Sequence, residues 1–382
     1  MAGLALGGAG MFAVMYATQA ILPVLGRDFG VSPSQAGLTI TVLIGAVAIG
    51  GWIWGPYSDR RGRKRSLVLA SALLVLPTVG AAVAPTFEIF LACRALQGLC
   101  MPGLLTVGVP YVAEVYAPAL GGRAMGYYLA SLVAGGIVSR VGVGLITAAV
   151  GWRWAFAALA VLPAAGALVM RRLLPEAPAP AVSGSRRGAL ARQLANPRLI
   201  APTAGAAALF FTFVSIASYV TYRLEAPPFG YGVEATSAIF VLWVIGAIGP
   251  TAGRVADRIG WRRLLAGALG LALAGVALSL PETLPTVVLG LACVITAMFS
   301  GLVGAQLGLA AATSRDRGTA SALYFTVYYV AGGLAAFVPG IAWEQAQWAG
   351  VAAIAAGVLA VGLALALAGP VRPAADAPAA DA

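Results

Sequence analysis

The chain has 382 residues and a formal charge of +11 at pH 7; 60% of its residues are hydrophobic and 10% are charged. Soluble domains contain about 45–50% apolar and about 25% charged residues, so this composition excludes a soluble globular protein and indicates an integral membrane protein. The basic residues lie between apolar stretches rather than on a solvated face with aromatic residues, which also excludes nucleic-acid binding.

Apolar stretches long enough to span a bilayer recur from one end of the chain to the other. A helix of about 17–25 apolar residues crosses roughly 30 Å of hydrocarbon. The first stretch carries no charge and lacks a basic leader region, so it predicts a retained helix rather than a cleaved signal peptide. We predict an all-α membrane protein with twelve transmembrane helices, at residues 3–25, 36–55, 66–85, 88–111, 123–148, 153–172, 199–222, 235–254, 263–281, 284–310, 318–341 and 346–369.

The basic residues predict which side of the membrane each loop occupies. Lys and Arg in short loops are retained on the cytoplasmic side during insertion. If the C-terminal segment and the loops after even-numbered spans lie in the cytoplasm, the cytoplasmic side holds all but five of the 24 basic residues. We therefore predict a multi-pass protein with both termini in the cytoplasm. The five exceptions are Arg27, Arg94, Arg140, Arg153 and Arg223.

A polar segment divides the spans six and six. Residues 173–198 include LPEAPAPAVSGSRRG, whose Pro, Ala, Ser and Gly content predicts a flexible cytoplasmic linker. It separates an N-terminal six-helix half, residues 1–172, from a C-terminal six-helix half, residues 199–370. The Ala-rich and Pro-rich residues 371–382 are predicted to form a disordered cytoplasmic tail.

A loop motif occurs after the second span of each half. GPYSDRRGRKR at residues 55–65 matches GRVADRIGWRR at residues 253–263, and both copies keep Gly, Asp-Arg, Gly and the final Arg. Such repetition is typical of transporters built from related halves. With RALQGLCMP in the fourth span, the chain resembles the major facilitator superfamily over nearly its whole length. Its helix-five pattern resembles the drug:proton antiporter branch of bacterial efflux permeases.

The resemblance implies a function for the loop motif as a gate. Gly55 is expected to let the second helix approach a neighbour closely. The resemblance places Asp59 against the positive start of helix eleven, at Gly318, and places Arg63 against Glu114. Such a latch would hold the cytoplasmic side closed in the outward-facing state. The predicted gating residues are Gly55, Asp59, Arg60, Gly62, Arg63, Glu114, Gly253, Asp257, Arg258 and Gly260.

The second copy of the motif predicts an asymmetric latch. Asp257 is expected to face the start of helix five, but Trp261 stands at the position that corresponds to Arg63. For Arg60, Arg61, Lys64 and Arg65 of the first copy, the alternative role is to orient the protein and attract anionic lipid headgroups.

Two arginines lie inside predicted spans, where an ionisable side chain costs about 2.5–3.5 kcal/mol on insertion scales. Arg94 and Gln97 share one helical face in the fourth span. The spacing resembles the family's helix-four motif, whose Arg is linked to proton coupling or to substrate charge. The alternative is that backbone carbonyls satisfy Arg94.

Arg140 departs from the family's helix-five motif. The motif continues from Gly135 to Gly-Pro, whereas this chain has Ser139-Arg140, so the kinking Pro is absent. Arg140 either contributes charge to a central cavity, favouring an anionic or hydroxyl-rich substrate, or is a structural charge between helices. Other polar residues pair at one-turn spacing and either line the cavity or pack between helices. They are Tyr16, Gln19, Ser215, Tyr219, Tyr324 and Tyr328.

The predicted function is that of a transporter rather than an enzyme. The chain has no histidine and no P-loop, and its three cysteines lie within spans, so we predict no metal site and no cofactor. No acidic residue lies at the middle of a span, so proton coupling rests on the resemblance: either Glu114 or Asp59 titrates, or the carrier is facilitative.

The resemblance implies a monomeric secondary transporter in the bacterial cytoplasmic (inner) membrane. It would export drug-like amphipathic compounds or sugars by alternating access and proton antiport, with the substrate, protons and the lipid bilayer as its partners. Two alternatives remain. One is a facilitative or uptake carrier of a small, anionic metabolite, and the other is a transporter-like sensor without transport activity.

Overall fold

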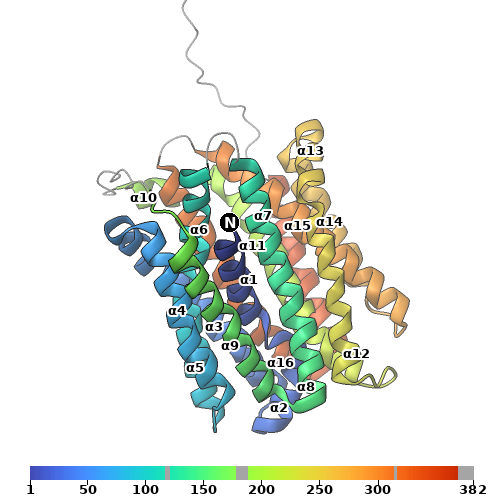
Figure 1. The fold of residues 1–382 in the computed structure, drawn as a ribbon. Helices are drawn as coiled ribbons and strands as arrows, with labels where there is room; N and C mark the ends of the chain where they lie inside the picture. The colour runs from blue at the N-terminus through green and yellow to red at the C-terminus, as the bar shows by residue number, and fades with distance from the viewer. Residues whose placement is uncertain (117–120, 178–187, 314–315, 369–382) are drawn as a thin grey trace, which may run out of the picture.

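The computed structural model describes residues 1–116, 121–177, 188–313 and 316–368, and all regular secondary structure within these ranges is helical. The helices run side by side and form one bundle (Figure 1). The predicted tail lies outside the described residues, as does the middle of the predicted linker.

The first half contains six spans, several of them made of consecutive helical segments. In chain order they are α1 (Ala2–Tyr16) with η1 (Gln19–Ile21) and α2 (Leu22–Phe29), α3 (Pro33–Arg61), α4 (Arg63–Ala82), α5 (Phe87–Cys100) with α6 (Pro102–Tyr116), α7 (Gly121–Ile137) with η2 (Val138–Gly142) and α8 (Val143–Val150), and α9 (Trp152–Leu173).

The second half follows a short helix, α10 (Ala189–Leu194), and the turn η3 (Pro197–Leu199). Its elements are α11 (Ile200–Glu225), α12 (Val233–Ala238) with η4 (Ile239–Ile248) and α13 (Gly249–Ile259), α14 (Trp261–Leu278), α15 (Leu284–Ala312) and α16 (Arg317–Ala368).

Length and composition support twelve membrane crossings. Ten helices of the described residues are long and apolar enough to cross a membrane, and the bent pair α12–α13 raises that number to eleven. One of these eleven is α16, which has 52 residues and whose backbone is not helical at Ala346 and Gln347. If α16 is divided at this kink it forms two spans, and the total becomes twelve. The fold class predicted from the sequence is confirmed.

Two spans occupy the centre of the bundle. In the first span, from α1 to α2, and in the span of α11, 83% of the most apolar stretch of 18 residues is buried within the protein. In the other candidate spans the buried share of that stretch is 33–50%. The first span and α11 therefore present little surface to lipid. Polar groups on these two spans meet other protein groups, and this places the candidate site between the halves.

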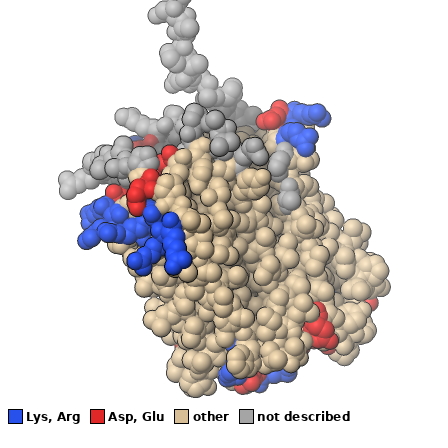
Figure 2. All heavy atoms as spheres, in the orientation of Figure 1, with Lys and Arg blue, Asp and Glu red and all other residues tan. Residues whose placement is uncertain are grey.

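Charged side chains gather at the two ends of the bundle, and the face shown in Figure 2 has an uncharged belt between them. We call the end with Arg60 to Arg65 and α10 the basic end, and the opposite end the far end. The amino group of Met1 donates to Tyr116 Oη at 3.1 Å, which places the N-terminus at the basic end. An uncharged belt between two charged ends is what a bilayer requires of a spanning protein.

The loop motif forms the same turn in both halves. Gly62 joins α3 to α4 with φ 91° and ψ 149°, and Gly260 joins α13 to α14 with φ 82° and ψ 152°. Side chains with a Cβ rarely adopt such positive φ angles, so both positions require glycine for the turn. The sequence repeat is therefore also a structural repeat.

Gly55 has a different environment from the one predicted. A Cβ atom added to Gly55 would meet no atom within 4 Å, so in this conformation Gly55 does not bring α3 close to a neighbour. Gly50, about one and a half turns earlier, has that role, because a Cβ there would lie 2.8 Å from the carbonyl oxygen of Leu99. The close approach predicted for Gly55 is not made in this conformation, and Gly253 is equally open.

Part of the predicted flexible linker is helical and attached to the second half. Arg192 in α10 forms an ion pair with Asp316 at 2.7 Å. Asn196 Nδ2 donates to the carbonyl of Ala312 at 3.2 Å. These bonds connect residues 192–196 of the linker to the end of α15 and to Asp316, just before α16.

Candidate functional site

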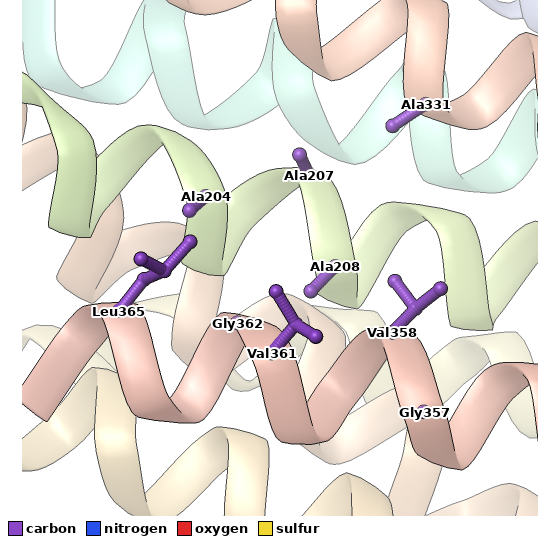
Figure 3. A pocket seen from close by; sticks show the side chains of 9 residues that line it. All are labelled: Ala204, Ala207, Ala208, Ala331, Gly357, Val358, Val361, Gly362 and Leu365. Atoms are coloured by element: carbon purple, nitrogen blue, oxygen red, sulfur yellow. The ribbon is translucent and has the colours of Figure 1, made fainter.

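Two cavities of the structure contain no fully buried charge. One cavity of about 280 Å³ lies between α11 and α16, and only Ala, Gly, Val and Leu residues line it, including Ala208 and Val361 (Figure 3). A second, of about 430 Å³, lies at the far end and includes Arg27, Tyr222 and Glu225. The first offers no polar group to fix a ligand. The second lies at the surface of the far end, so a site deep in the bundle must be identified from its buried charges.

Arg140 is fully buried between the two halves. Its Nε and Nη2 donate to Gln19 Oε1 at 2.9 and 2.6 Å, and its Nη1 donates to the carbonyl of Gly136 at 3.0 Å. The guanidinium carbon lies 4.1 Å from the ring centre of Tyr16 and 4.3 Å from that of Trp243. Since Trp243 belongs to the second half and the other partners to the first, Arg140 connects the halves.

The three spans that meet at Arg140 all depart from regular α-helix at this level. The first span breaks between Tyr16 and Gln19, where α1 ends and the 3-10 turn η1 begins. Arg140 itself lies in the π-helical segment η2, and Trp243 lies in the 3-10 segment η4. Irregular turns inside helices are frequent at functional sites, and transporters bind substrates where spans are broken.

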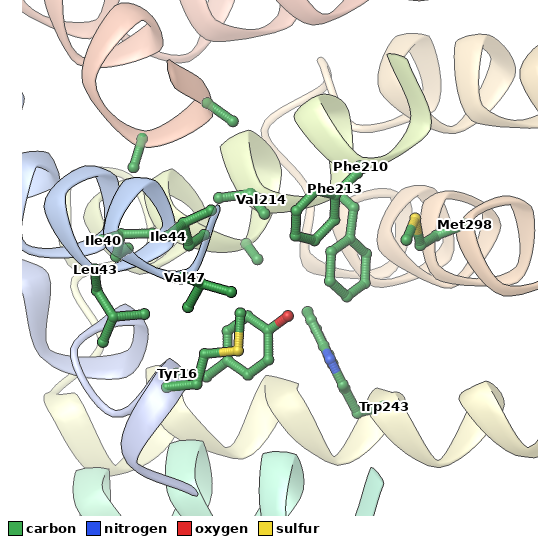
Figure 4. Packing of buried hydrophobic residues seen from close by; sticks show 14 of the residues in the cluster. Tyr16, Ile40, Leu43, Ile44, Val47, Phe210, Phe213, Val214, Trp243 and Met298 are labelled. Carbon is green, nitrogen blue, oxygen red and sulfur yellow. The ribbon is translucent and has the colours of Figure 1, made fainter. Parts of the chain in front are cut away.

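Aromatic side chains lie close to this position, and Figure 4 shows Tyr16, Phe210, Phe213 and Trp243 within the buried hydrophobic cluster. Phe240 lies 5.4 Å from the guanidinium carbon of Arg140, and Phe213 lies 4.8 Å from Trp243. Phe210 stacks on Tyr328 with 4.0 Å between ring centres. Ring faces attract cations, so the aromatic residues compensate part of the charge of Arg140, and they provide an apolar wall.

The polar groups at the site are incompletely satisfied. A guanidinium has five N–H donors; three of those of Arg140 bond to Gln19 and Gly136, which leaves one N–H on each Nη without a partner among the described residues. The hydroxyl of Thr18, next to Gln19, is buried and also lacks a described partner. None of the described Asp and Glu residues is fully buried, so the charge of Arg140 has no buried acid beside it.

Backbone carbonyls satisfy Arg94, as the alternative to a coupling role predicts. It donates to the backbone carbonyls of Thr39, Val14 and Met15 at 2.9–3.0 Å, and to Gln97 Oε1 at 2.7 Å. Val14 and Met15 lie in the last turn of α1, where carbonyls have no partner in their own helix. Arg94 and Gln97 therefore stabilise the broken end of α1 instead of joining the group around Arg140.

The other sequence candidates divide in the same way. Tyr16 and Gln19 contact Arg140 directly. The hydroxyls of Ser215 and Tyr219 donate to the carbonyls of Ala335 and Ala336, and so connect α11 to α16. Tyr324 is 1% exposed and its hydroxyl has no partner among the described residues. Tyr16 and Gln19 are at the site, whereas Ser215 and Tyr219 are packing residues.

Sequence reasoning missed the second half's contribution to this site. Phe240 and Trp243 lie in an uninterrupted apolar run, where nothing distinguishes them from lipid-facing or packing residues. Their spacing of three residues, which places side chains on one helical face, was the available signal.

At the basic end, the first copy of the loop motif forms a compact group. Arg63 pairs with Glu114 at 3.1 Å and with Asp59 at 3.2 Å, and its Nη1 donates to Ser58 Oγ at 2.8 Å. The Asp59 side chain is 46% exposed. Gly318, at the start of α16, has open space around it, since a Cβ there would meet no atom within 4 Å. The Asp59 carboxylate bonds to Arg63, and no bond joins it to a described residue of α16 in this conformation.

The second copy of the motif replaces the ion pair with apolar packing. The ring of Trp261 packs on α15 at Gly308, where a Cβ would lie 2.7 Å from the ring. Asp257 is exposed and forms no ion pair with a described residue. Its predicted target, at residues 121–123, has no described side chains.

At the far end, the halves are joined. Every hydrogen bond between the halves for which both partners are described lies at this end or near Arg140. The bonds near the far end include Arg27 to Glu225 at 2.6 Å, Ser34 N–H to Glu344 at 3.0 Å and Thr41 to the carbonyl of Gly333 at 2.6 Å. The far end is therefore closed, whereas no hydrogen bond or ion pair between described residues joins the halves at the basic end.

Comparison with known proteins agrees with this arrangement. The family model described as Major Facilitator Superfamily matches residues 4–336. The inner membrane transport protein YnfM of Escherichia coli (strain K12) is 30% identical over 370 residues, covering 94% of this chain and 88% of that protein. The uncharacterized MFS-type transporter YybF of Bacillus subtilis (strain 168) is 25% identical over 357 residues, covering 92% and 88%.

Solved structures share the fold at low sequence identity. A mutant of the nucleoside transporter NupG matches with a TM-score of 0.80 at 14% identity, covering 96% of this chain and 98% of that one. A bacterial homolog of the human lysosomal transporter Spinster, in an inward-facing and occupied conformation, matches with a TM-score of 0.74 at 18% identity, covering 96% and 92%.

Two six-helix halves with broken spans meeting at a buried charge define a secondary transporter of small molecules. The chain belongs to the major facilitator superfamily. It is accordingly a multi-pass membrane transporter and not an enzyme.

Proposed function

We propose that the protein is a monomeric secondary carrier of the bacterial cytoplasmic membrane that exports small amphipathic molecules in exchange for protons. The basic end is cytoplasmic, since Lys and Arg stay on that side during insertion. With this orientation the described conformation faces inward. The observation that carries the proposal is the meeting of three irregular spans from both halves at Arg140, because rocking of the halves would alternate access to this position.

Proton coupling requires a titrating group, and we assign it to the basic end. None of the described acidic residues is buried at the centre of the bundle. Glu114 and Asp59 both bond to Arg63, so a proton on either carboxylate removes one of that arginine's partners. Release of Arg63 would then accompany movement of the halves.

Counterflow in proteoliposomes tests the carrier function. Vesicles loaded with an unlabelled compound should accumulate the labelled compound only if the protein exchanges it. We expect exchange for members of a panel of amphipathic drugs, sugars and organic acids, with stimulation by a pH gradient. We also expect Arg140→Ala to lower the exchange rate by at least about tenfold, because a lost charged hydrogen bond costs about 1.5–3 kcal/mol.

A facilitative or uptake carrier of a small anion is the second candidate. The uncompensated charge of Arg140 favours it. Exchange that is indifferent to the pH gradient would select this candidate over proton antiport. Absence of counterflow for the whole panel would contradict both carrier functions and leave a sensor.

A further inference from the structure

We infer that the substrate carries a carboxylate that binds in the plane of the Arg140 guanidinium, on a flat, unsaturated or aromatic body. This inference rests on the proposed function, since it names the substrate class of the same site. It begins with the hydrogen bonds of Arg140. Gln19 Oε1 accepts from Nε and Nη2, and the carbonyl of Gly136 accepts from Nη1.

The remaining donors of Arg140 fit a two-oxygen acceptor. One N–H on Nη1 and one on Nη2 have no described partner, and these two atoms belong to one guanidinium fork. A carboxylate accepts from both atoms of such a fork at once, in the plane of the group. A single neutral oxygen can accept from two N–H groups, as Gln19 Oε1 does, but it leaves the positive charge of Arg140 uncompensated. The two remaining donors and the charge together favour a carboxylate over a sugar hydroxyl.

Aromatic rings pack closely against the guanidinium. The ring centres of Tyr16 and Trp243 lie 4.1 and 4.3 Å from its central carbon, so these rings restrict how an additional group can reach it. These rings are 7% and 4% exposed, whereas Arg140 is fully buried. A ligand that reaches the arginine must therefore pass the rings of Tyr16 and Trp243.

The surroundings also constrain the body of the ligand. Phe213 packs on Trp243 (Figure 4), and the ring centre of Phe240 lies 5.4 Å from the guanidinium carbon. A flat unsaturated body can stack on rings or meet their edges, whereas a hydroxyl-rich body would lose its water without gaining partners. The hydroxyl of Thr18 adds one neutral polar group without a described partner.

Gln19 provides a sharp test of the charge requirement. Gln19→Glu would replace the amide whose oxygen now accepts from Nε and Nη2 with a carboxylate. The protein itself would then neutralise the charge of Arg140. A substrate carboxylate would then meet a neutral pair. The matched control is Gln97→Glu, which makes the same change beside the other buried arginine, Arg94.

The experiment measures ligand binding by thermal shift of the purified full chain in detergent. The probes are benzoate and cinnamate, with benzamide and cinnamamide as neutral counterparts. We expect the carboxylates to bind wild-type protein at least about tenfold more tightly than the amides, as a charged hydrogen bond implies. Gln19→Glu should abolish this preference, Arg140→Lys should reduce it because Lys lacks the planar fork, and Gln97→Glu should keep it.

Three results would overturn the inference: equal binding of amides and carboxylates, no binding of either carboxylate, or a preference that persists in folded Gln19→Glu protein. Size-exclusion profiles establish that each variant is folded. Counterflow of labelled benzoate separates this inference from the proposed function. Binding preference without counterflow would contradict the carrier function alone, and counterflow of neutral compounds without a carboxylate preference would contradict the inference alone.

Discussion

Arg94 stabilises the end of α1 through its bonds to three backbone carbonyls. Arg94→Ala would leave these buried acceptors without a donor, and each such loss costs about 1–3 kcal/mol. We expect the variant to lose at least about 3 kcal/mol of stability, or not to accumulate as folded protein. Thermal unfolding in detergent, followed by intrinsic fluorescence, measures the effect.

The control for Arg94 is an exposed arginine. Arg60→Ala removes the same side chain from the exposed basic end and should unfold at the wild-type temperature. Wild-type stability of Arg94→Ala would contradict the structural role and return Arg94 to the list of coupling residues.

The sequence predicts that two arginines lie in the membrane, but it distinguishes their roles only in part. Each interrupts an apolar stretch in the same way, so composition places both inside spans. Their partners differ because α1 breaks near Tyr16 and exposes carbonyls to Arg94, whereas Arg140 meets rings from the other half. Both environments depend on contacts between distant segments, and no local pattern encodes these contacts.

At the scale of elements, the glycines of the first motif copy should tolerate substitution unequally. Gly62 has φ 91°, so Gly62→Ala forces a strained backbone that costs about 1–2 kcal/mol. Gly55 lies inside α3 with open space at its Cβ position, so Gly55→Ala should not destabilise this conformation and should stabilise it by up to about 1 kcal/mol. Parallel thermal unfolding curves of the two variants test the difference.

The two glycine variants separate a backbone requirement from a packing requirement. Equal destabilisation by both would contradict the assignment of the turn to Gly62. A Gly55→Ala protein that is stable but fails to transport would show that Gly55 packs closely only in the other conformation.

Hydropathy predicted the spans well and their irregular segments not at all. The seventh span, predicted at residues 199–222, agrees with α11 (Ile200–Glu225), because a run of apolar residues fixes where the chain is buried. The π segment around Arg140 and the 3-10 segment around Trp243 follow from packing between the halves. Hydrophobic periodicity describes one helix at a time, so it cannot predict them.

At the scale of the whole molecule, Asp59 is expected to act in the conformation opposite to the described one. Its exposed carboxylate would meet the start of α16 only when the basic end closes, where free N–H groups and the helix dipole favour a negative charge. Asp59→Asn should therefore lower transport at least about tenfold with unchanged membrane insertion. Uptake or efflux by inverted vesicles measures transport; rates like those of the wild type would contradict a latch.

A substitution at the far end should favour the opposite conformation, because Arg27 and Glu225 join the halves in the described one. The ion pair has one exposed partner, so it contributes up to about 1 kcal/mol. Arg27→Ala should shift the population toward the conformation open at the far end by up to about fivefold. Spin labels at Glu88→Cys and Glu282→Cys, one in each half, should report a larger population of long distances.

The matched control is Asp28→Ala, which breaks an ion pair at the same end but within one half. Asp28 pairs with Arg153 at 2.8 Å and accepts from Trp152, so its loss should leave the distance between the halves unchanged. The labels require a background without Cys93, Cys100 and Cys293, which are free. If Arg27→Ala and Asp28→Ala give the same distances, the pair with Glu225 does not close the far end. If only Arg27→Ala increases the distance between the halves, closure of the far end depends on the Arg27–Glu225 ion pair, which must break in every transport cycle.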